Sequence, residues 1–271
     1  MAAELDAVIT EAGVLDNRPL SAATRLLVLD CPAVARAATP GRFVKLRAWP
    51  GPEENLGGPL LDRPFSIHRA EGGQLSLLYR IVGPATRLLS EVSPGAQVRL
   101  TGPLGRGLPE ALTRRSGLYL VAGGIGLAPM ALARDWLASA GGQATLFYGE
   151  RTAAAQVEES WLKTWAGQDW VATVEDGSGY GRPGLVTEPL AQALQREARP
   201  IFACGPWPLL AAVANLARRY SAPALVSVEA GMACGLGVCL TCSLPLAVGG
   251  RFRACQEGPV VDALAVDWGA A

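Results

Sequence analysis

Four of the six cysteines in this 271-residue chain lie within 22 consecutive residues, from Cys234 to Cys255. The segment that contains them, from Gly231 onward, is short and rich in glycine and shows no helical or strand-like periodicity. A segment of this size buries too little apolar surface to hold a fold alone, so it needs a cross-link. We therefore expect a small C-terminal domain over residues 229–271, organised around these cysteines.

The spacing of the four cysteines indicates the kind of cross-link. Cys234, Cys239 and Cys242 are separated by four and two residues, and Cys255 follows after twelve more. The first two gaps match the C-x4-C-x2-C spacing typical of [2Fe–2S] clusters, whose ligands are thiolates. Two alternatives stay open: a zinc site with four cysteine ligands, which more often shows two C-x2-C pairs, and disulfides, which are uncommon in the cytosol.

Short β-rich runs with turn residues between them occupy the N-terminal part of the chain. The runs are residues 4–15, 23–31, 42–49, 64–70, 74–82 and 96–102. Pro40-Gly41 and Pro94-Gly95 are two of the turns, and one helix is expected at 84–92, where Pro84 follows Gly83. This pattern predicts an antiparallel β-barrel as the first domain, over residues 1–112.

The pattern changes near Thr113 to an alternation of strands and helices. Strands are expected at 118–124, 144–150, 170–177, 200–206 and 224–229, and helices at 127–140, 155–166, 185–198 and 208–221. Repeated alternation of this kind predicts a doubly wound parallel sheet of about five strands. We assign it to an α/β domain over residues 113–228.

A glycine-rich loop, AGGIGLAP at residues 122–129, follows the first of these strands and opens a helix. Gly123, Gly124 and Gly126 permit close approach of a ligand to the backbone, and a helix N-terminus favours a diphosphate. The loop has Pro129 where a dinucleotide fingerprint has its third glycine, so a plain tight turn stays open. A second loop, at 204–208, ends a later strand of the same sheet, and both loops are expected to face one crevice.

Charge and histidine content exclude several classes of function. Lysine plus arginine and aspartate plus glutamate both number 24, which makes nucleic acid a poor candidate ligand. The single histidine, His68, rules out a multi-histidine metal site. The uncharged stretches 116–133 and 230–250 are too interrupted by glycine, proline and cysteine to suit a membrane helix, and no secretory signal is expected at the N-terminus, so we expect a cytoplasmic protein without a membrane partner.

Four motifs taken in order resemble the ferredoxin–NADP reductase superfamily. They are Arg63-Pro64-Phe65-Ser66, Gly83-Pro84-Ala85-Thr86, Gly123-Gly124-Ile125-Gly126-Leu127-Ala128-Pro129 and Cys204-Gly205-Pro206. The C-terminal sequence MACGLGVCLTC…RACQEGPV resembles, more narrowly, the electron-transfer subunits of type B dihydroorotate dehydrogenases. The resemblance covers essentially the whole chain.

This resemblance implies FAD in the barrel and NAD(H) in the α/β domain. Arg63 would hold an FAD phosphate, Ser66 would lie near the flavin N5, His68 would line the flavin, and Cys204 would lie near the nicotinamide. The other implied contacts are Pro64, Phe65, Ile67, Tyr79, Arg80, Ile81, Gly83 and Thr86 for FAD, and Gly123, Gly124, Gly126, Gly205 and Pro206 for NAD(H). No catalytic side chain is expected, because hydride transfer needs positioning. Residues 105–108 read Gly-Arg-Gly-Leu where relatives often read Gly-Asn-Gly-Phe, so no role is assigned to them.

The function implied is electron transfer between one-electron and two-electron carriers. A separate FMN-containing catalytic subunit would oxidise dihydroorotate in pyrimidine biosynthesis, and this chain would pass the electrons through the [2Fe–2S] cluster and FAD to NAD⁺. A heterotetramer of the two subunits is expected. The alternatives are a related NAD(P)H-dependent reductase subunit for an oxygenase, hydrogenase or sulfur-reducing partner, and a zinc-stapled binding module without catalysis.

The second strand of the expected sheet predicts the choice of nucleotide. It ends at Glu150, which is followed by Arg151. An acidic residue here accepts hydrogen bonds from the adenosine 2′-hydroxyl, whereas an arginine accommodates a 2′-phosphate. Glu150 lies 24 residues after Gly126, near the spacing of about 20 expected for the acidic partner, and the family resemblance also favours NAD(H).

Flavin reduction in stopped flow should therefore give a higher kcat/KM with NADH than with NADPH. The variant E150Q should narrow the difference, because it removes the charge that repels a 2′-phosphate. A preference of the unmodified protein for NADPH would contradict this and would assign Arg151 to the phosphate.

Overall fold

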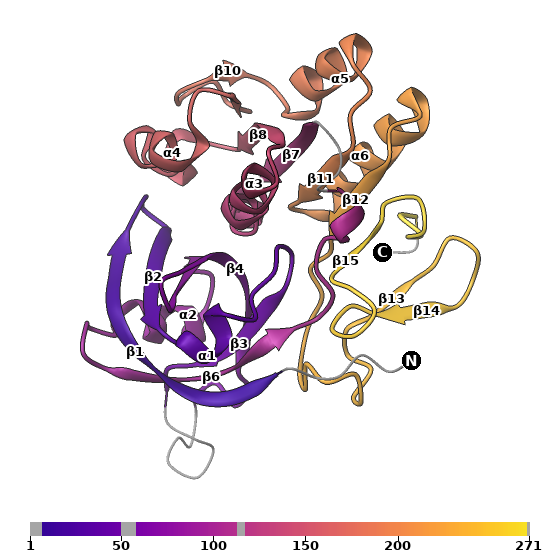
Figure 1. Ribbon diagram of the computed structural model, residues 1–271. Coiled ribbons are helices and arrows are strands. Elements are labelled where there is room, and N and C mark those ends of the chain that lie inside the picture. The colour runs from indigo at the N-terminus through magenta and orange to yellow at the C-terminus, as the bar shows by residue number, and fades with distance from the viewer. Residues whose placement is uncertain (1–6, 50–57, 113–116, 270–271) are drawn as a thin grey trace.

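The chain forms three parts that pack against one another: a barrel, a sheet flanked by helices, and a C-terminal segment along one side (Figure 1). The structure, a computed structural model, describes residues 7–49, 58–112 and 117–269. The start of the strand expected at 4–15, and residue 113 at the expected domain boundary, lie outside the described residues.

Six antiparallel strands close into the barrel in the order β1-β2-β5-β4-β3-β6. They are β1 (Val8–Pro19), β2 (Thr24–Asp30), β3 (Phe43–Arg47), β4 (Arg63–Glu71), β5 (Gln74–Arg80) and β6 (Gln97–Leu104). Successive residues of a strand face opposite sides, so Leu75, Leu77 and Tyr79 of β5 all enter the barrel core. Helix α1 (Pro32–Ala35) follows β2, and α2 (Pro84–Ser90) follows β5. The predicted antiparallel barrel is confirmed.

The second part is a seven-stranded sheet with the order β10-β9-β8-β7-β11-β12-β15. Its strands are β7 (Gly117–Gly123), β8 (Gln143–Glu150), β9 (Trp170–Val174), β10 (Arg182–Pro183), β11 (Ile201–Cys204), β12 (Ala224–Ser227) and β15 (Val260–Asp262). All pairs are parallel except β12 with β15. The predicted doubly wound parallel sheet is confirmed, and it contains two short edge strands, β10 and β15, in addition to the five expected.

Helices cover both faces of this sheet. They are α3 (Met130–Ser139), α4 (Glu159–Ala166), α5 (Thr187–Arg196) and α6 (Trp207–Tyr220), with short 3₁₀ turns η1 (Glu110–Leu112), η2 (Gly124–Leu127) and η3 (Ala153–Ala155). Leu118 and Leu120 of β7 pack with α3 and α4, while Tyr119 and Val121 pack with α5 and α6. A strand buried on both faces explains the uninterrupted apolar run in β7.

The chain reverses direction across the sheet between β7 and β11. From β7 the strands run outward through β8, β9 and β10, and the chain then returns to place β11 on the other side of β7. Such a reversal leaves a crevice at the carboxyl ends of the two central strands, which is where open α/β sheets bind ligands. Among the described residues no helix is long and apolar enough to cross a membrane.

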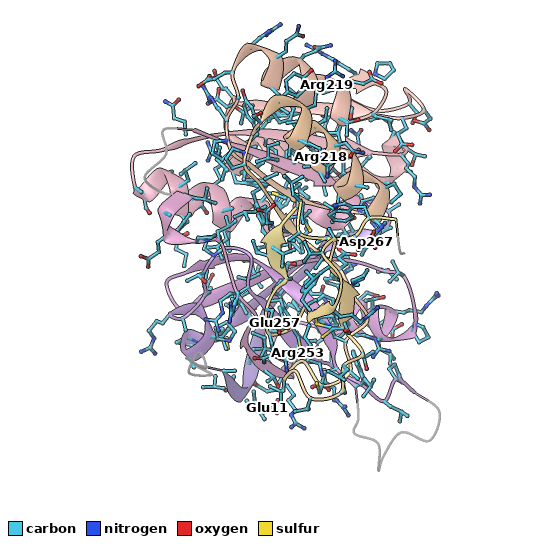
Figure 2. The ribbon with its side chains drawn as sticks, turned by 90° about the vertical axis from the view of Figure 1, so that its right-hand side faces the viewer. Glu11, Arg218, Arg219, Arg253, Glu257 and Asp267 are labelled. Carbon is cyan, nitrogen blue, oxygen red and sulfur yellow. The ribbon has the colours of Figure 1, made fainter. Side chains whose placement is uncertain are left out.

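The C-terminal segment contains the hairpin β13 (Ser243–Pro245) and β14 (Arg251–Arg253) and then supplies β15. Figure 2 shows this segment in front of the junction between barrel and sheet, with Arg253 and Glu257 beside the barrel. Because β15 pairs with β12, the segment is part of the sheet as well as a cysteine-rich unit.

Polar contacts join the barrel to the helix-covered sheet. Arg69 of β4 binds Asp135 of α3 through two hydrogen bonds of 2.6 and 2.9 Å. His68 lies beside them, with its Nδ1 at 2.8 Å from the carbonyl oxygen of Ala128 and its ring stacked on Trp161. Burial lowers the pKa of His68 to about 4, so the ring is neutral near pH 7. His68 is thus a packing residue of this junction.

Gly126 is the point where the glycine loop meets β11, and it yields a test of this packing. A Cβ atom there would overlap the carbonyl oxygen of Cys204 and lie 2.7 Å from the amide nitrogen of Gly205. Backbone atoms cannot rotate away, so Gly126→Ala should lower the free energy of unfolding by about 1–3 kcal/mol, the range for an overpacked interior. Thermal unfolding followed by circular dichroism measures the loss.

The matched control is Gly13→Ala in β1, where a Cβ atom meets its nearest neighbour at 3.6 Å. Equal Tm values for the two variants would show that the glycine loop moves freely away from β11.

Candidate functional site

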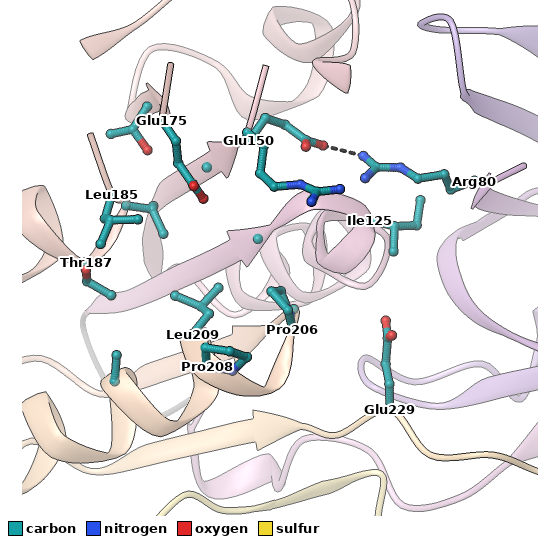
Figure 3. Close-up of a pocket in the computed structure, with 18 residues that line it drawn as sticks. Arg80, Ile125, Glu150, Glu175, Leu185, Thr187, Pro206, Pro208, Leu209 and Glu229 are labelled. Atoms are coloured by element: carbon teal, nitrogen blue, oxygen red, sulfur yellow. Dashed lines mark hydrogen bonds and ion pairs between the residues drawn. The ribbon is translucent and has the colours of Figure 1, made fainter. Parts of the chain in front are cut away.

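A cavity of about 560 Å³ opens at the carboxyl ends of β7 and β11. Gly123, Gly124 and Ile125 of the glycine loop line it together with Gly205 and Pro206 of the second loop. Figure 3 shows Ile125 and Pro206 at this cavity. The structure therefore brings the two loops expected from the sequence into one crevice. Gly126 and Cys204 lie behind these lining residues, packed against each other.

Acidic and basic side chains line the same cavity. Glu150, at the end of β8, is 5% exposed and accepts hydrogen bonds from Arg80 and, at 3.2 Å, from the Tyr148 hydroxyl. Burial raises the pKa of Glu150, and the neighbouring Arg80 opposes that rise. Arg151 and Glu175 line the cavity beside it and are exposed. Glu150 therefore has a structural partner in the barrel in addition to the ribose contact that its sequence position predicts.

A second cavity, of about 390 Å³, lies at the barrel. It is lined by residues of all three barrel segments singled out in the sequence: Arg63, Pro64, Phe65, Ser66, Tyr79, Arg80, Gly83 and Thr86. Three other residues expected there lie elsewhere, and one of them is His68, which packs against Trp161 at the junction described above. Ile67 is fully buried in the barrel core, and Ile81 packs against that core.

The turn before α2 is held in place by Thr86. Its Oγ1 accepts hydrogen bonds from the amides of Val82 and Gly83, at 2.9 and 3.2 Å. Pro84 occupies the first turn of the helix, where its missing N–H costs no hydrogen bond. This turn lines the second cavity together with residues of β4, so the Gly-Pro-Ala-Thr motif shapes the cavity through its backbone.

The two cavities share a wall made of Arg80, Ile125 and Glu229. Behind it lies Cys204, whose pKa is raised by burial and by the charge of Glu229 and lowered by the Ser227 hydroxyl. Burial also raises the pKa of Glu229, against the effect of Arg80. Ligands in the two cavities would therefore meet at this wall. The Cys204 thiol behind it stays protonated near neutral pH, so the arrangement suits hydride transfer by positioning more than acid–base chemistry.

Glu229 and Thr187 line the cavity although the sequence did not predict them as ligand-binding residues. Glu229 lies just beyond β12, and Thr187 begins α5. Neither belongs to a recognisable motif, and only the strand order brings them to the crevice. Glu229 carried one usable signal, because it ends the last predicted strand, at 224–229, on the carboxyl edge where ligands bind.

The four clustered cysteines lie as two pairs. The Sγ atoms of Cys242 and Cys255, both buried, are 3.2 Å apart. Cys239 is exposed, and hydrogen bonds from Thr241 and Cys234 lower its pKa to about 6. Burial, followed by the neighbouring Cys242, raises the pKa of Cys255 to about 12.

This pairing bears on which metal group fits. A two-iron cluster takes two cysteines per iron, whereas a zinc ion takes all four ligands at one point. The pairs therefore suit a [2Fe–2S] cluster better than a zinc ion.

The backbone between the first two cysteines also suits a cluster. Gly235 and Gly237 have φ of +74° and +79°, a conformation that other residues rarely adopt. The amide of Leu236 donates to the Cys234 sulfur at 3.3 Å, and N–H groups directed at sulfur are one way in which proteins tune such clusters.

The loop at residues 105–108, for which no role was predicted from the sequence, contacts the cysteine segment. The Arg106 amide donates to the Gly258 carbonyl at 2.6 Å. Gly105 has φ of +74°, and a Cβ atom on it would lie 2.6 Å from Cδ of Pro259. The loop is thus a contact between the barrel and the segment that follows Cys255.

Comparison with known proteins agrees with this geometry. The family model described as the iron–sulfur cluster binding domain of dihydroorotate dehydrogenase B matches residues 229–267. A relative from Desulforamulus reducens, named dihydroorotate dehydrogenase B (NAD(+)), electron transfer subunit, is 35% identical over 266 residues, covering 96% of this chain and 98% of its own. Relatives of the same name from Clostridium acetobutylicum and Geobacillus thermodenitrificans are 36% and 34% identical, covering 82% and 91% of this chain and 83% and 94% of their own.

Solved structures show the same fold. The structure of an NADH-dependent reduced ferredoxin-NADP oxidoreductase superposes with a TM-score of 0.81 at 25% identity, covering 95% of this chain and 90% of that one. The cytochrome P450 reductase of Amycolatopsis gives a TM-score of 0.64 at 25% identity over 79% of this chain and 66% of that one. With relatives at this level of identity along nearly its whole length, the chain belongs to the family of dihydroorotate dehydrogenase B electron transfer subunits.

Proposed function

We propose that this chain transfers electrons from a [2Fe–2S] cluster through FAD to NAD⁺. A cluster exchanges electrons singly, a nicotinamide takes a hydride, and a flavin does both, so the three together convert one-electron into two-electron transfer. The observation that carries the proposal is the shared wall of Arg80, Ile125 and Glu229, which keeps the two cavities in direct contact.

The chain's own residues act by binding and orientation. Arg63 would hold an FAD phosphate, and its guanidinium is already held by the Leu61 carbonyl at 2.5 Å. Ser66 and Tyr79 line the same cavity and would orient the flavin. The nucleotide would lie in the other cavity, on the glycine loop and on residues 205–206. We retain 1–112, 113–228 and 229–271 as the FAD, NAD(H) and cluster domains.

The electron donor would be an FMN-containing dihydroorotate dehydrogenase catalytic subunit, in a cytoplasmic heterotetramer. The relatives' shared name, electron transfer subunit, supports a separate catalytic partner. The catalytic subunit would dock on the loop around the exposed Cys239, where Leu236, Val238 and Leu240 expose their apolar side chains. Apolar side chains clustered on a surface are typical of protein interfaces.

Two variants test the separation of flavin and cluster sites. Cys239→Ser should abolish the iron–sulfur absorbance and leave FAD bound, because Cys239 lies outside both cavities. Arg63→Ala should do the reverse, weakening FAD retention by about 1–3 kcal/mol, the range for a lost charge-assisted hydrogen bond, with unchanged iron content.

Visible spectra and iron, sulfide, zinc and FAD analysis measure both effects. A colourless protein with one zinc ion would sink the electron-transfer proposal. A full cluster in Cys239→Ser would show that the ligand assignment is wrong, and unchanged FAD affinity in Arg63→Ala would remove that residue from the site.

A third variant tests the docking surface. Val238 is 78% exposed beside Cys239. Val238→Asp would bury an unpaired carboxylate in the proposed interface and should weaken binding to the catalytic subunit at least about tenfold, or about 1.4 kcal/mol. The control is Val248→Asp, since Val248 is 93% exposed in the hairpin turn of the same segment. Equal affinities of the two variants, measured by titration calorimetry, would place the interface elsewhere.

A further inference from the structure

Lys45 is one of only two lysines in a chain with 22 arginines, and it is 6% exposed. It lies in the middle of β3, on the wall of the barrel that faces the cysteine segment. Its Nζ donates to the carbonyl oxygen of Ala233 and lies 3.4 Å from that of Cys234. A buried ammonium group therefore binds the peptide that leads into the first cluster cysteine.

The aliphatic part of the Lys45 side chain is also closely packed. A Cβ atom on Gly235 would lie 2.6 Å from Cδ of Lys45 and 3.3 Å from Cδ1 of Leu104. Gly235 also has φ of +74°. The glycine after Cys234 is thus required both by the backbone turn and by the lysine beneath it, so the cysteine loop and β3 fit each other closely.

The charge of Lys45 has no partner carboxylate among the residues that the structure describes, where seven ion pairs involve other side chains. Its contacts are neutral carbonyl groups. Burying a cation without a counter-charge is unfavourable. The cysteine segment supplies negative charge next to this position when its thiolates bind a cluster, and the cluster gains one further negative charge when it is reduced.

We propose that Lys45 is a positioning residue for the iron–sulfur cluster, which fixes the Ala233–Cys234 peptide to the barrel and raises the reduction potential of the cluster with its buried charge. This rests on the proposed function, since it requires the cluster. Net charge and hydrogen bonding near the sulfurs are among the factors that set such potentials. The same contact ties the cluster to the domain that would hold FAD, and so would keep the two redox centres in a fixed relation.

The experiment compares three variants of the full chain, loaded with cluster and FAD. K45M removes the charge and the hydrogen bonds, K45Q removes the charge and keeps a donor, and K163M is the control. Lys163 is the other lysine, on the exposed face of α4, where it pairs with Glu159 at 2.8 Å. Midpoint potentials come from redox titration followed by electron paramagnetic resonance.

In both K45M and K45Q the cluster potential should fall by about 59 mV, a tenfold change for one electron, while K163M stays at the value of the unmodified protein. A loaded K45M or K45Q with an unchanged potential would overturn the proposal. Absence of any cluster in the unmodified protein would instead defeat the proposed function, so the two failures are distinguishable.

Lysine labelling tests the contact without any substitution. Brief acetylation of the native holoprotein, read out by mass spectrometry, should modify Lys163 and leave Lys45 unmodified. Unfolding in denaturant should make the two equally reactive. Equal labelling of both lysines in the native protein would overturn the proposal, even if neither Lys45 variant retained a cluster.

Discussion

The ion pair between the partly buried Arg80 and the buried Glu150 is the contact on which the relation of the two cavities depends. Arg80 ends a barrel strand, Glu150 ends a strand of the sheet, and both side chains line the nucleotide cavity. Such a pair adds little net stability, but the buried carboxylate is costly to leave without its partner. Its effect is therefore to fix the two domains in one relative position, which hydride transfer between their ligands requires.

The cysteine segment is fixed by contacts of a different kind. Lys45 holds the peptide before the first ligand, the loop at residues 105–108 holds the segment after the last one, and Phe43 and Leu104 of the barrel pack in one core with Cys242 and Cys255. Hydrogen bonds and apolar packing therefore anchor both ends of the segment. The exposed loop at Cys239 is left on the outside, where an electron donor can approach it.

The sequence predicted the architecture because each domain has its own period of apolar residues. Alternation in β5 and the continuous apolar run of β7 are local signals, and the cysteine spacing is a still more specific one. The positions of Ile67 and His68 were not predictable, because a shift in register between β4 and β5 lies at these residues and decides which side chains face the cavity. Glu229 and Lys45 were missed since their partners come from distant parts of the chain.

The last strand of the sheet, β15, has a consequence for how the protein matures. It begins five residues after Cys255, and it covers the edge of β12. A nascent chain therefore completes its nucleotide-binding sheet only after every cluster ligand has been synthesised. By pairing with β12, this strand satisfies backbone groups that would otherwise be a template for association with another chain. The cluster ligands and the strand that protects this edge of the sheet thus lie in the same short stretch of polypeptide.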